Sequence, residues 1–516
     1  MPHVMLPFSP MAVCLLVEAA SKAGNSSRNS LVLSYRGDIP DVLALWGSWP
    51  PEGRIMGFNR VAAGDLAFLE SLVGSDRVST GQSILDLHSR DESYHKGYRP
   101  EVVIWPKCTE EVVAILRMAN ERMIPVTPWG AGTSLEGNPL AVEGGMVLDF
   151  ELMDQILAAR AEDFQVDVQP GVKYKDMNRI LARHGLFFAP DPGANATIGG
   201  MVANNASGVR TVKYGATRDN VLRLVAVLPT GEVFHAGSFS HKSSSGYDLV
   251  RLLIGSEGTL GVITEITLRL AGIPEKFSAA VVTFDSVQNA ADAVYEIMGS
   301  GLIPAALELL DAETIETINR DGKVSLAERP TLFLEFTGSS DVSLEEDLKL
   351  AKEICDANGA VGFESGVGRE ERNRLWEARH EAYESVQRCN PGLDNLILDT
   401  AVPLSKYSNM VEYAGKVAAS HHLKAYRFGH AGDGNLHLVI VGDFGDEEFV
   451  KRLNQGNEEI VSHAISVGGT ATGEHGIGIG KKRFMIQEHG DGVEVMRRIK
   501  NLLDPNGILN PGKILP

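Results

Sequence analysis

The most informative stretch of this sequence is Pro190-Asp-Pro-Gly-Ala-Asn-Ala-Thr-Ile-Gly-Gly-Met-Val-Ala-Asn-Asn-Ala-Ser-Gly208, followed closely by Lys213-Tyr-Gly215. Its nineteen positions hold four glycines, three asparagines and two small hydroxyl residues. Glycine and asparagine weaken helix and strand interiors, so we expect an extended segment whose polar backbone is satisfied by a partner. A large flat cofactor with many hydrogen-bonding edges suits it better than solvent. A plain surface loop is the alternative, although functionless loops of this length are uncommon in compact domains.

Two further glycine-rich segments flank this stretch, namely Thr127-Pro-Trp-Gly-Ala-Gly-Thr-Ser-Leu-Glu-Gly-Asn138 and Gly255-Ser-Glu-Gly-Thr-Leu-Gly261. A glycine-rich loop that leaves a strand presents backbone N–H groups, which suit a pyrophosphate, and Thr133 and Ser134 add hydroxyl donors. The first segment has neither the G-x-G-x-x-G nor the G-x-x-x-x-G-K-[ST] spacing, so neither a Rossmann nor a P-loop site is predicted. Alone, that segment is equally compatible with a tight turn; the three segments together favour a cofactor site.

Hydrophobic periodicity around these segments predicts a strand, helix, strand order, which is an α/β signature. A helix is expected to begin at a capping Thr109, and the hairpin turns through Pro229-Thr230-Gly231. The other predicted elements are strands over residues 101–106, 123–128, 146–150, 164–168 and 260–270, a helix over 172–184, and hairpin strands over 222–228 and 232–236.

The pattern changes after Pro274. Strands are predicted over residues 279–284, 331–336 and 361–365, with helices over 287–298 and 344–357. Ser343 and Glu346 would form a capping box at the start of the second helix. Paired β-α-β segments of this size predict a ferredoxin-like cap domain. Residues 366–425 are interpreted as a long insert that contains a helix around 376–386.

Composition excludes several classes of protein. With 48 basic and 67 acidic side chains, the formal net charge is −19, which argues against a nucleic-acid partner. Four cysteines without a C-x-x-C spacing exclude a disulfide scaffold and make a thiolate zinc site unlikely. Because no run of eighteen apolar residues exists, no transmembrane segment is predicted. A cytoplasmic location is expected, with mitochondrial or peripheral membrane association and a homodimer left open.

A fourth cluster near the C-terminus combines Gly429-His-Ala-Gly-Asp-Gly-Asn-Leu-His437 with Gly473-Glu-His-Gly-Ile-Gly478. The Gly432-Asp-Gly434 turn would let His430 and His437 meet across a hairpin. Adding Glu474 gives two histidines and a carboxylate, a set that suits a divalent ion with open positions for a substrate. His475 is not needed as a ligand and is free to act as a base. Each histidine taken singly is more often a hydrogen-bonded structural residue; the full set favours a metal site.

The three glycine-rich segments together resemble the flavoprotein superfamily that includes vanillyl-alcohol oxidase and p-cresol methylhydroxylase. The resemblance implies a two-part α+β domain that binds FAD. Residues that match the pyrophosphate cradle are Pro128, Gly130, Ala131, Gly132, Thr133, Ser134, Gly137 and Asn138. Residues that match the isoalloxazine and ribityl lining are Pro192, Gly193, Thr197, Gly200, Asn204, Ser207, Gly208, Tyr214 and Gly215. Gly258, Val262 and Ile263 match the adenine side. Because the pyrophosphate loop lacks histidine, we expect FAD to be held without a covalent bond through that loop.

A more detailed resemblance extends over about residues 95–516. It rests on residues 190–275, Asp399-Thr-Ala-Val-Pro-Leu-Ser405, 430–437 and 473–478, and on the ending Leu503-Asp-Pro-Asn-Gly-Ile-Leu-Asn-Pro-Gly-Lys513. These stretches are similar to FAD-linked D-lactate dehydrogenases, with D-2-hydroxyglutarate dehydrogenases and the flavin subunit of glycolate oxidase as close cousins. The similarity implies zinc at the metal site, with manganese or iron also compatible. It also implies a cytochrome, a quinone or an electron-transfer flavoprotein as electron acceptor.

The expected domains are a poorly ordered leader over residues 1–60, with Met56 as an alternative start, and an FAD-binding domain over 61–275. A cap domain with the substrate and metal sites follows over 276–465, and residues 466–516 return to the FAD domain. Arg379 matches the family arginine that pairs with the substrate carboxylate; an exposed helix arginine is the alternative.

Oxidising a 2-hydroxy acid requires an anchored carboxylate, an acidified hydroxyl and a hydride acceptor. A divalent ion serves the first two, His475 would take the hydroxyl proton, and flavin N5 would accept the hydride from C2. A metal-dependent hydrolase would leave the glycine-rich segments unexplained, and a non-catalytic FAD-binding protein would leave the metal cluster without a purpose.

The expected substrate is a D-2-hydroxy monocarboxylate such as D-lactate. D-2-Hydroxyglutarate dehydrogenases carry a lysine two positions before the aspartate that matches Asp399, where this chain has Ile397. Without that lysine a distal carboxylate would be desolvated without a partner. Arg388 is a basic residue that could replace it.

Overall fold

The structure, a computed structural model, describes residues 57–322 and 325–516. The leader predicted over residues 1–60 thus lies outside the described residues except for residues 57–60. There, Asn59 donates its backbone N–H to the Met123 carbonyl over 2.9 Å, and Arg60 forms an ion pair with Glu101 over 2.8 Å.

A four-stranded sheet carries the first glycine-rich segment. Its parallel core of β2, β4 and β3 is formed by short buried runs, and α4 crosses from β2 to β3 with its apolar side buried. The strands, in sheet order, are β1 (Val78–Ser79), β2 (Val102–Ile104), β4 (Met146–Asp149) and β3 (Val126–Trp129). The helices are α2 (Ala63–Val73), α3 (Gln82–Leu87) and α4 (Thr109–Arg122). Thr109 is the first helical residue; the cap position belongs to Cys108, whose side chain makes no capping hydrogen bond.

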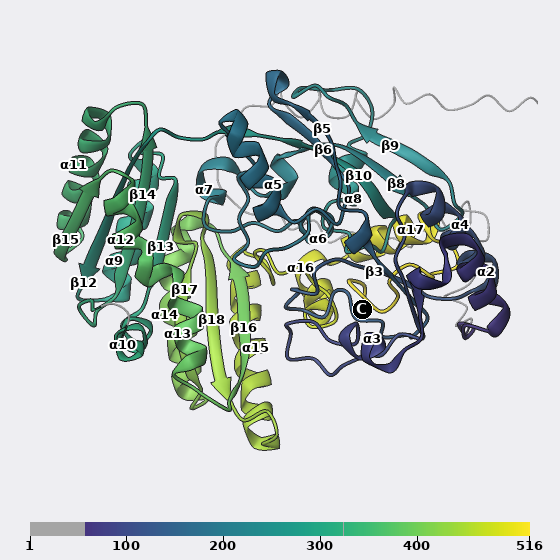
Figure 1. The fold of residues 1–516 in the computed structure, drawn as a ribbon. Coiled ribbons are helices and arrows are strands. Elements are labelled where there is room, and N and C mark those ends of the chain that lie inside the picture. The colour runs from purple at the N-terminus through teal and green to yellow at the C-terminus, as the bar shows by residue number, and fades with distance from the viewer. Residues whose placement is uncertain (1–56, 323–324) are drawn as a thin grey trace, which may run out of the picture. The chain divides into compact units, whose positions relative to one another are not determined.

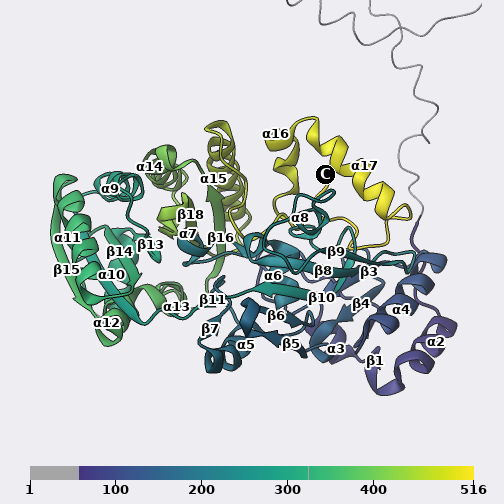
Figure 2. The same cartoon turned by 90° about the horizontal axis from the view of Figure 1, so that it is seen from above.

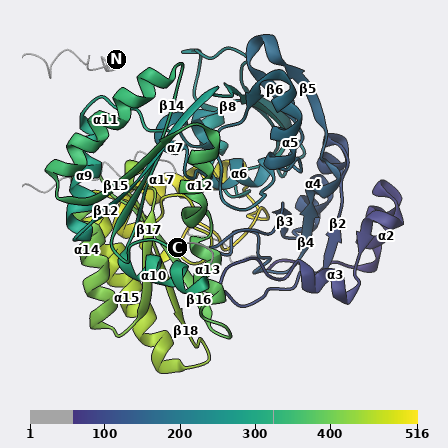
Figure 3. The same ribbon diagram turned by 60° about the vertical axis from the view of Figure 1, so that its left-hand side comes forward.

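A second, antiparallel sheet of five strands carries the other two glycine-rich segments. The predicted hairpin is present as β8 and β9, with Val227 opposite Val233. The strands, in sheet order, are β5 (Ile156–Arg160), β6 (Gln165–Val168), β10 (Val262–Arg269), β8 (Val221–Val227) and β9 (Val233–Gly237). Beside it lie α5 (Tyr174–Leu181), α6 (Ile198–Asn204), α7 (Thr211–Tyr214), α8 (Leu249–Leu253) and the small pair β7 (Leu186–Phe187) and β11 (Ala271–Gly272). Figure 3 shows α5 and α6 next to this sheet.

Helix α6 corrects the expectation that residues 190–208 are extended throughout. The Thr197 hydroxyl caps the helix by accepting a hydrogen bond from the Gly200 N–H over 3.3 Å. Ile198, Met201 and Val202 are buried in the core of the five-stranded sheet. Burial of these side chains outweighs the low helix propensity of the two glycines within the helix, because tertiary packing routinely overrides propensity.

A seven-stranded antiparallel sheet follows, in the order β15-β12-β14-β13-β17-β18-β16 (Figure 1). Its first four strands, numbered along the chain, stand in the order 4-1-3-2 with two helical crossovers, which is the predicted ferredoxin-like arrangement. The elements are β12 (Lys276–Phe284), α9 (Val287–Gly299), β13 (Ala306–Leu310), α10 (Ala312–Asp321), β14 (Thr331–Gly338), α11 (Asp341–Ala357) and β15 (Ala360–Val367). Helix α11 is capped by Ser340 rather than by Ser343, which lies in its first turn.

The residues predicted as an insert begin a second unit of the same topology. It comprises α12 (Arg369–His380), α13 (Ala382–Arg388), β16 (Asp394–Ala401), α14 (Leu404–Ser420), β17 (Lys424–Gly429), β18 (Asn435–Gly442) and α15 (Glu447–Ser466). A bridge between Thr470 and Ala401 supplies a minimal fourth strand beside β16. Strand β17 pairs with β13 and joins the two units. Helices α9, α14 and α15 cover one face of the sheet, and α10, α12 and α13 cover the other (Figure 2).

The C-terminal segment, which contains α16 (Met485–His489) and α17 (Gly492–Leu503), runs back to the first sheet (Figures 1 and 2). Leu509 forms a parallel bridge with Val126, and the Asn510 N–H donates to the Val126 carbonyl over 2.8 Å. Within the described part of the chain, no helix combines the length and the apolar character needed to cross a membrane.

Candidate active site

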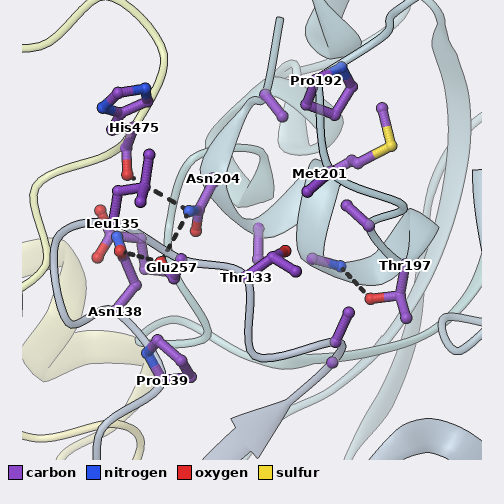
Figure 4. Close-up of a pocket in the computed structure, with 18 of the residues that line it drawn as sticks. Thr133, Leu135, Asn138, Pro139, Pro192, Thr197, Met201, Asn204, Glu257 and His475 are labelled. Atoms are coloured by element: carbon purple, nitrogen blue, oxygen red, sulfur yellow. Dashed lines mark hydrogen bonds between the residues drawn. The ribbon is translucent and has the colours of Figure 1, made fainter. Parts of the chain in front are cut away.

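The three glycine-rich segments line a single cavity, although they lie far apart in the sequence (Figure 4). Asn204 stands between two of its walls: its Nδ2 donates to Ser134 Oγ over 3.5 Å and to the His475 carbonyl over 3.4 Å. The Ser134 hydroxyl in turn donates to the Asn138 carboxamide oxygen. These bonds connect the loop after β3, helix α6 and the C-terminal Glu474–His475 segment at one place.

The loop after β3 offers the donors that a pyrophosphate requires. The backbone N–H groups of Ala131, Gly132 and Thr133 donate to no oxygen of the described residues. At Gly130 a Cβ would collide with the Thr197 hydroxyl that caps α6, so only glycine allows the loop and the helix to approach this closely. Free N–H groups in a glycine-lined cavity fit the diphosphate of a dinucleotide such as FAD.

Most residues predicted to bind the cofactor line this cavity or a smaller adjoining one. Those that line the main cavity are Pro128, Gly130, Ala131, Gly132, Thr133, Ser134, Asn138, Pro192, Gly193, Thr197, Gly200, Asn204, Ser207 and Gly258. Val262 and Ile263 line the smaller cavity, which shares Pro128, Gly130 and Gly258 with the main one.

Gly137, Gly208, Tyr214 and Gly215 lie outside the lining of both cavities. Gly137 contacts Ile479, Gly208 packs against the Asp191 backbone and Gly215 against the Asp219 side chain, while Tyr214 meets Phe187 edge-on. These four residues therefore shape the turns around the cavity, and their contact with the cofactor stays a prediction.

Glu257 is a cavity residue that the sequence reasoning missed. It is buried, has a positive φ of 51°, and its carboxylate accepts from the N–H groups of Ile477 (2.6 Å) and Gly478 (2.9 Å). A non-glycine residue in the left-handed region is uncommon, so this conformation is held by its surroundings. The sequence feature that could have identified Glu257 is its position inside the third glycine-rich segment. Met201 and Asn510 also line the cavity and were missed.

The predicted metal ligands come together beside this cavity. The hairpin of β17 and β18 brings His430 and His437 to ring centroids 5.1 Å apart, and at Gly434 a Cβ would collide with the Val402 carbonyl. Glu474 Oε1 lies 3.3 Å from His430 Nε2 and 3.1 Å from His437 Nε2. Ligands about 2.0–2.1 Å from a tetrahedral ion stand roughly 3.4 Å from one another, so the donor set fits a divalent ion such as zinc.

Asp399 organises the residues around this donor set, and sequence reasoning assigned it no role. Its Oδ2 accepts from the Thr472 hydroxyl and from the N–H groups of Gly473, Glu474 and His475, at 2.8–3.1 Å. Its carboxylate also lies 3.7 Å from His437 Nδ1 and 4.0 Å from His475 Nδ1. The carboxylate therefore fixes the Glu474–His475 segment.

The two residues predicted to be catalytic lie on different sides of the donor set. His475 lines the main cavity, and its Nε2 lies 3.7 Å from Glu474 Oε1. Arg379 is not an exposed helix arginine: its side chain is 12% exposed and pairs with the fully buried Glu308 over 2.7 Å. Glu308 also contacts His430, at 2.7 Å from Nδ1. Sequence reasoning did not identify Glu308, because a single acidic residue in an apolar strand carries no motif.

The charged groups at the site shift one another's pKa values. Burial raises the pKa of Glu474, but the neighbouring His430 and His437 outweigh burial and hold that pKa well below its ordinary value. Burial alone would lower the pKa of His430, yet Glu308 and Glu474 raise it well above its ordinary value. For His475 burial dominates and lowers the pKa, so its imidazole is neutral over more of the pH range. A neutral imidazole is the form that can accept a proton.

Two family profiles match this chain: the FAD binding domain over residues 100–237 and the C-terminal domain of FAD linked oxidases over residues 273–514. The sequence is 41% identical to the probable mitochondrial D-lactate dehydrogenase of Danio rerio over 449 residues, which is 86% of this chain and 90% of that protein. This chain belongs to the FAD-linked oxidases. It is also 41% identical to the mitochondrial D-lactate dehydrogenase [cytochrome] of Arabidopsis thaliana, over 86% of this chain and 78% of that protein.

Another relative of this FAD-linked oxidase is the glycolate oxidase subunit GlcD of Bacillus subtilis, at 37% identity over 83% of this chain and 92% of the relative. Among solved structures, substrate-bound p-cresol methylhydroxylase superposes with a TM-score of 0.69 at 16% identity, covering 88% of this chain and 97% of that one. That likeness shows the shared fold. The FAD-linked oxidase thus has the α+β architecture of the vanillyl-alcohol oxidase and p-cresol methylhydroxylase superfamily, as the sequence predicted.

Proposed function

We propose that this FAD-linked oxidase converts a D-2-hydroxy acid to the 2-oxo acid, with D-lactate or a slightly larger aliphatic homologue as substrate. The observation that carries the proposal is the position of two consecutive residues. Glu474 completes the donor set with His430 and His437, while both Glu474 and His475 line the cavity formed by the glycine-rich segments. A candidate metal site and the FAD cavity therefore share a wall.

In this proposal His430, His437 and Glu474 hold a divalent ion, and the glycine-lined cavity holds FAD without a covalent bond. When bound, the ion would polarise and acidify the substrate hydroxyl, and FAD would accept the hydride. His475 has its Nε2 3.7 Å from Glu474 Oε1, so it is within reach of a hydroxyl at the donor set and takes the proton. Arg379 contributes a positive charge for the substrate carboxylate.

The surface beside the donor set supports a monocarboxylate. In the β16–β18 pairing Asp399 stands opposite His437 and Ile397 opposite Val439, so these residues share one face of the sheet. Val439 and Tyr426 are buried there, and Ile397 packs against them. A second carboxylate on this surface would lose its hydration without gaining a partner, at a cost of about several kcal/mol.

Arg388, the basic residue that could have replaced a lysine at position 397, is occupied elsewhere. Its guanidinium lies 2.6 Å from Asp321 and 2.7 Å from Glu381. These ion pairs direct its charge away from a substrate. With Arg388 held in these ion pairs, the apolar Ile397 side chain favours D-lactate over D-2-hydroxyglutarate, and the small size of glycolate would leave the apolar surface uncovered.

Anaerobic addition of substrate to the purified protein tests the proposal. The protein should show oxidised-flavin absorbance that bleaches on addition of D-lactate and much less on addition of L-lactate. A cytochrome, a quinone analogue or an electron-transfer flavoprotein should then restore the absorbance. The Arabidopsis relative, D-lactate dehydrogenase [cytochrome], supports a cytochrome. A metal-dependent hydrolase, the alternative from another class, would carry no flavin, and a flavin that no 2-hydroxy acid reduces would refute the proposal.

A further inference from the structure

Glu308 lies at the centre of β13, a strand buried along its whole length. Ala306 and Leu310, on the same face of the strand, pack in the apolar core beneath α12 and α13. The Glu308 side chain itself is 0% exposed. A carboxylate in such a position is costly unless charged and hydrogen-bonded partners surround it.

Both oxygens of the carboxylate are used, each by a different part of the site. Oε1 lies 2.7 Å from His430 Nδ1. Oε2 accepts from Arg379 Nε over 2.9 Å and from Nη2 over 2.7 Å. The other guanidinium nitrogen of Arg379, Nη1, donates to no described residue, so it is the part of Arg379 left for a ligand.

The same helix carries a second ion pair that lacks a histidine. Arg372 stands two turns before Arg379 on α12, and its Nε donates to Glu335 Oε2 over 2.6 Å. Glu335 lies on β14 directly opposite Ala306, so its side chain is on the same face as Glu308. Its side chain is 3% exposed. The two pairs therefore attach one helix to one sheet in the same way, and only Glu308 touches the donor set.

We propose that Glu308 is a positioning residue that couples the metal ligand His430 to the substrate-binding Arg379. This inference rests on the proposed function. Glu308 accepts the Nδ1–H of His430 and so fixes the tautomer in which Nε2 is free to bind the ion. Buried carboxylates orient metal-bound histidines in the same way. Because Glu308 Oε2 accepts from both Nε and Nη2, it turns the guanidinium so that only Nη1 is offered. The Glu308 carboxylate thereby sets the separation between His430 and Arg379. His430 would hold the metal ion that binds the 2-hydroxyl group, and Arg379 would bind the substrate carboxylate.

Zinc affinity and steady-state kinetics of Glu308→Gln, with Glu335→Gln as the matched control, test this role. Loss of a partner of this kind costs roughly 10–100-fold in metal affinity, so Glu308→Gln should bind zinc that much more weakly in a chelator competition. Its KM for D-lactate should also rise with zinc at saturation, because Arg379 is no longer oriented. Glu335→Gln should keep the zinc affinity and KM of the wild type. FAD absorbance and the thermal midpoint report the fold of each variant.

If Glu308→Gln binds zinc as tightly as the wild type, the inference is overturned. Equal losses of zinc affinity in Glu308→Gln and Glu335→Gln would also overturn it, because they would show that only the attachment of α12 to the sheet matters. If Glu308→Gln does not fold, Glu308→Asp against Glu335→Asp takes its place, with the same outcomes. A wild-type protein that binds zinc but oxidises no 2-hydroxy acid would contradict the proposed function and leave the zinc comparison valid. A wild-type protein that binds no zinc would overturn both.

Discussion

Ser207 donates a hydrogen bond from Oγ to Glu474 Oε2 over 2.9 Å, across 267 residues of sequence. Ser207 belongs to the glycine- and asparagine-rich stretch that lines the FAD cavity, and Glu474 belongs to the proposed metal donor set. The second Glu474 oxygen faces His430 and His437. The Glu474 carboxylate is thus held by the flavin-binding part of the chain while it faces the donor set.

Ser207→Ala should weaken metal binding while FAD stays bound. Hydrogen bonds to charged groups contribute about 1.5–3 kcal/mol, so the zinc affinity should fall by roughly tenfold or more. Zinc competition on the FAD-loaded protein measures the effect. Ser134→Ala is the matched control, since that hydroxyl bonds Asn138 and Asn204 in the same cavity without touching Glu474. A larger loss of zinc affinity in the control would count against the link.

His437→Ala should abolish turnover without loss of FAD or of the fold. The donor set contains only three protein ligands, so removal of one should release the ion, whereas the cavity lining does not include His437. Flavin absorbance and turnover of D-lactate are the two readouts. His463→Ala, at a half-buried histidine that contacts Asn409 away from the donor set, is the control. Release of flavin from the His437 variant would contradict the separation of the two sites.

His475→Asn should lower kcat by roughly 10²–10⁴-fold, the usual contribution of a positioned base. Burial lowers the pKa of His475 below its ordinary value, so the neutral base persists in mildly acidic solution. In the wild type, kcat should therefore fall on the acid side at a pH below the ordinary histidine pKa of about 6.5. The variant should lose that acid limb. A pH profile with the same limb and a near-normal kcat would remove His475 from the role of base.

Ile397→Lys should shift specificity toward D-2-hydroxyglutarate. The new ammonium group would meet a distal carboxylate beside Val439 and Tyr426, where the wild type has the apolar Ile397 side chain. The ratio of kcat/KM for D-2-hydroxyglutarate to that for D-lactate measures the shift, and Ile397→Leu controls for repacking. If the wild type already prefers the dicarboxylate, the interpretation of Ile397 is wrong.

His88 should stabilise the fold mainly at acidic and neutral pH. Its ring nitrogens lie 2.8 Å from the Ile84 carbonyl and 2.9 Å from Asp149 Oδ2, so both nitrogens face acceptors and the imidazolium is favoured. Burial lowers the pKa, but the hydrogen bond to Asp149 and further interactions outweigh burial and raise it. A raised pKa in the folded state gives stability that is complete below the unfolded pKa of about 6.5 and is lost as pH rises through the folded value.

The measurement for His88 compares thermal unfolding of His88→Gln and the wild type across pH. The difference between their midpoints should be largest below pH of about 6.5 and should shrink in alkaline solution. His184→Gln, at an exposed histidine outside the core, is the control. A difference that grows with pH would reverse the sign and contradict the charged state inferred for His88.

Much of the fold followed from periodicity in the sequence. The hairpin of β8 and β9, strand β10 and helix α9 lie close to their predicted positions, because each has a regular apolar pattern with clear ends. Strand β13 was missed because its continuous apolar run Ala306–Leu310 is short, and periodicity alone does not distinguish such a run from a buried helix segment. Helix α6 was missed because its propensity is poor and its stability comes from Ile198, Met201 and Val202 in the core.

The site was predictable where chemistry is repeated in the sequence and not where it depends on one residue. The glycine-rich segments and the His430, His437 and Glu474 donors carry local motifs. Glu308 and Glu257 carry none: each is a single acid whose partners lie far away in the sequence, 71 and 122 residues for Glu308 and 220 residues for Glu257. Only the strand register that sets β13 beside β17 reveals that Glu308 faces His430.

The bond from Asn510 Nδ2 to the Asn138 carbonyl, 372 residues apart, has a consequence for synthesis on the ribosome. Asn510 also donates to the Glu257 carbonyl, so the first and third glycine-rich segments each lack a hydrogen-bond partner until Asn510 has been synthesised. At about 5–20 residues per second, translation needs roughly 20–75 s between Asn138 and Asn510. During that interval the cavity in the nascent chain is incomplete. FAD should therefore bind only after the C-terminal segment has been synthesised.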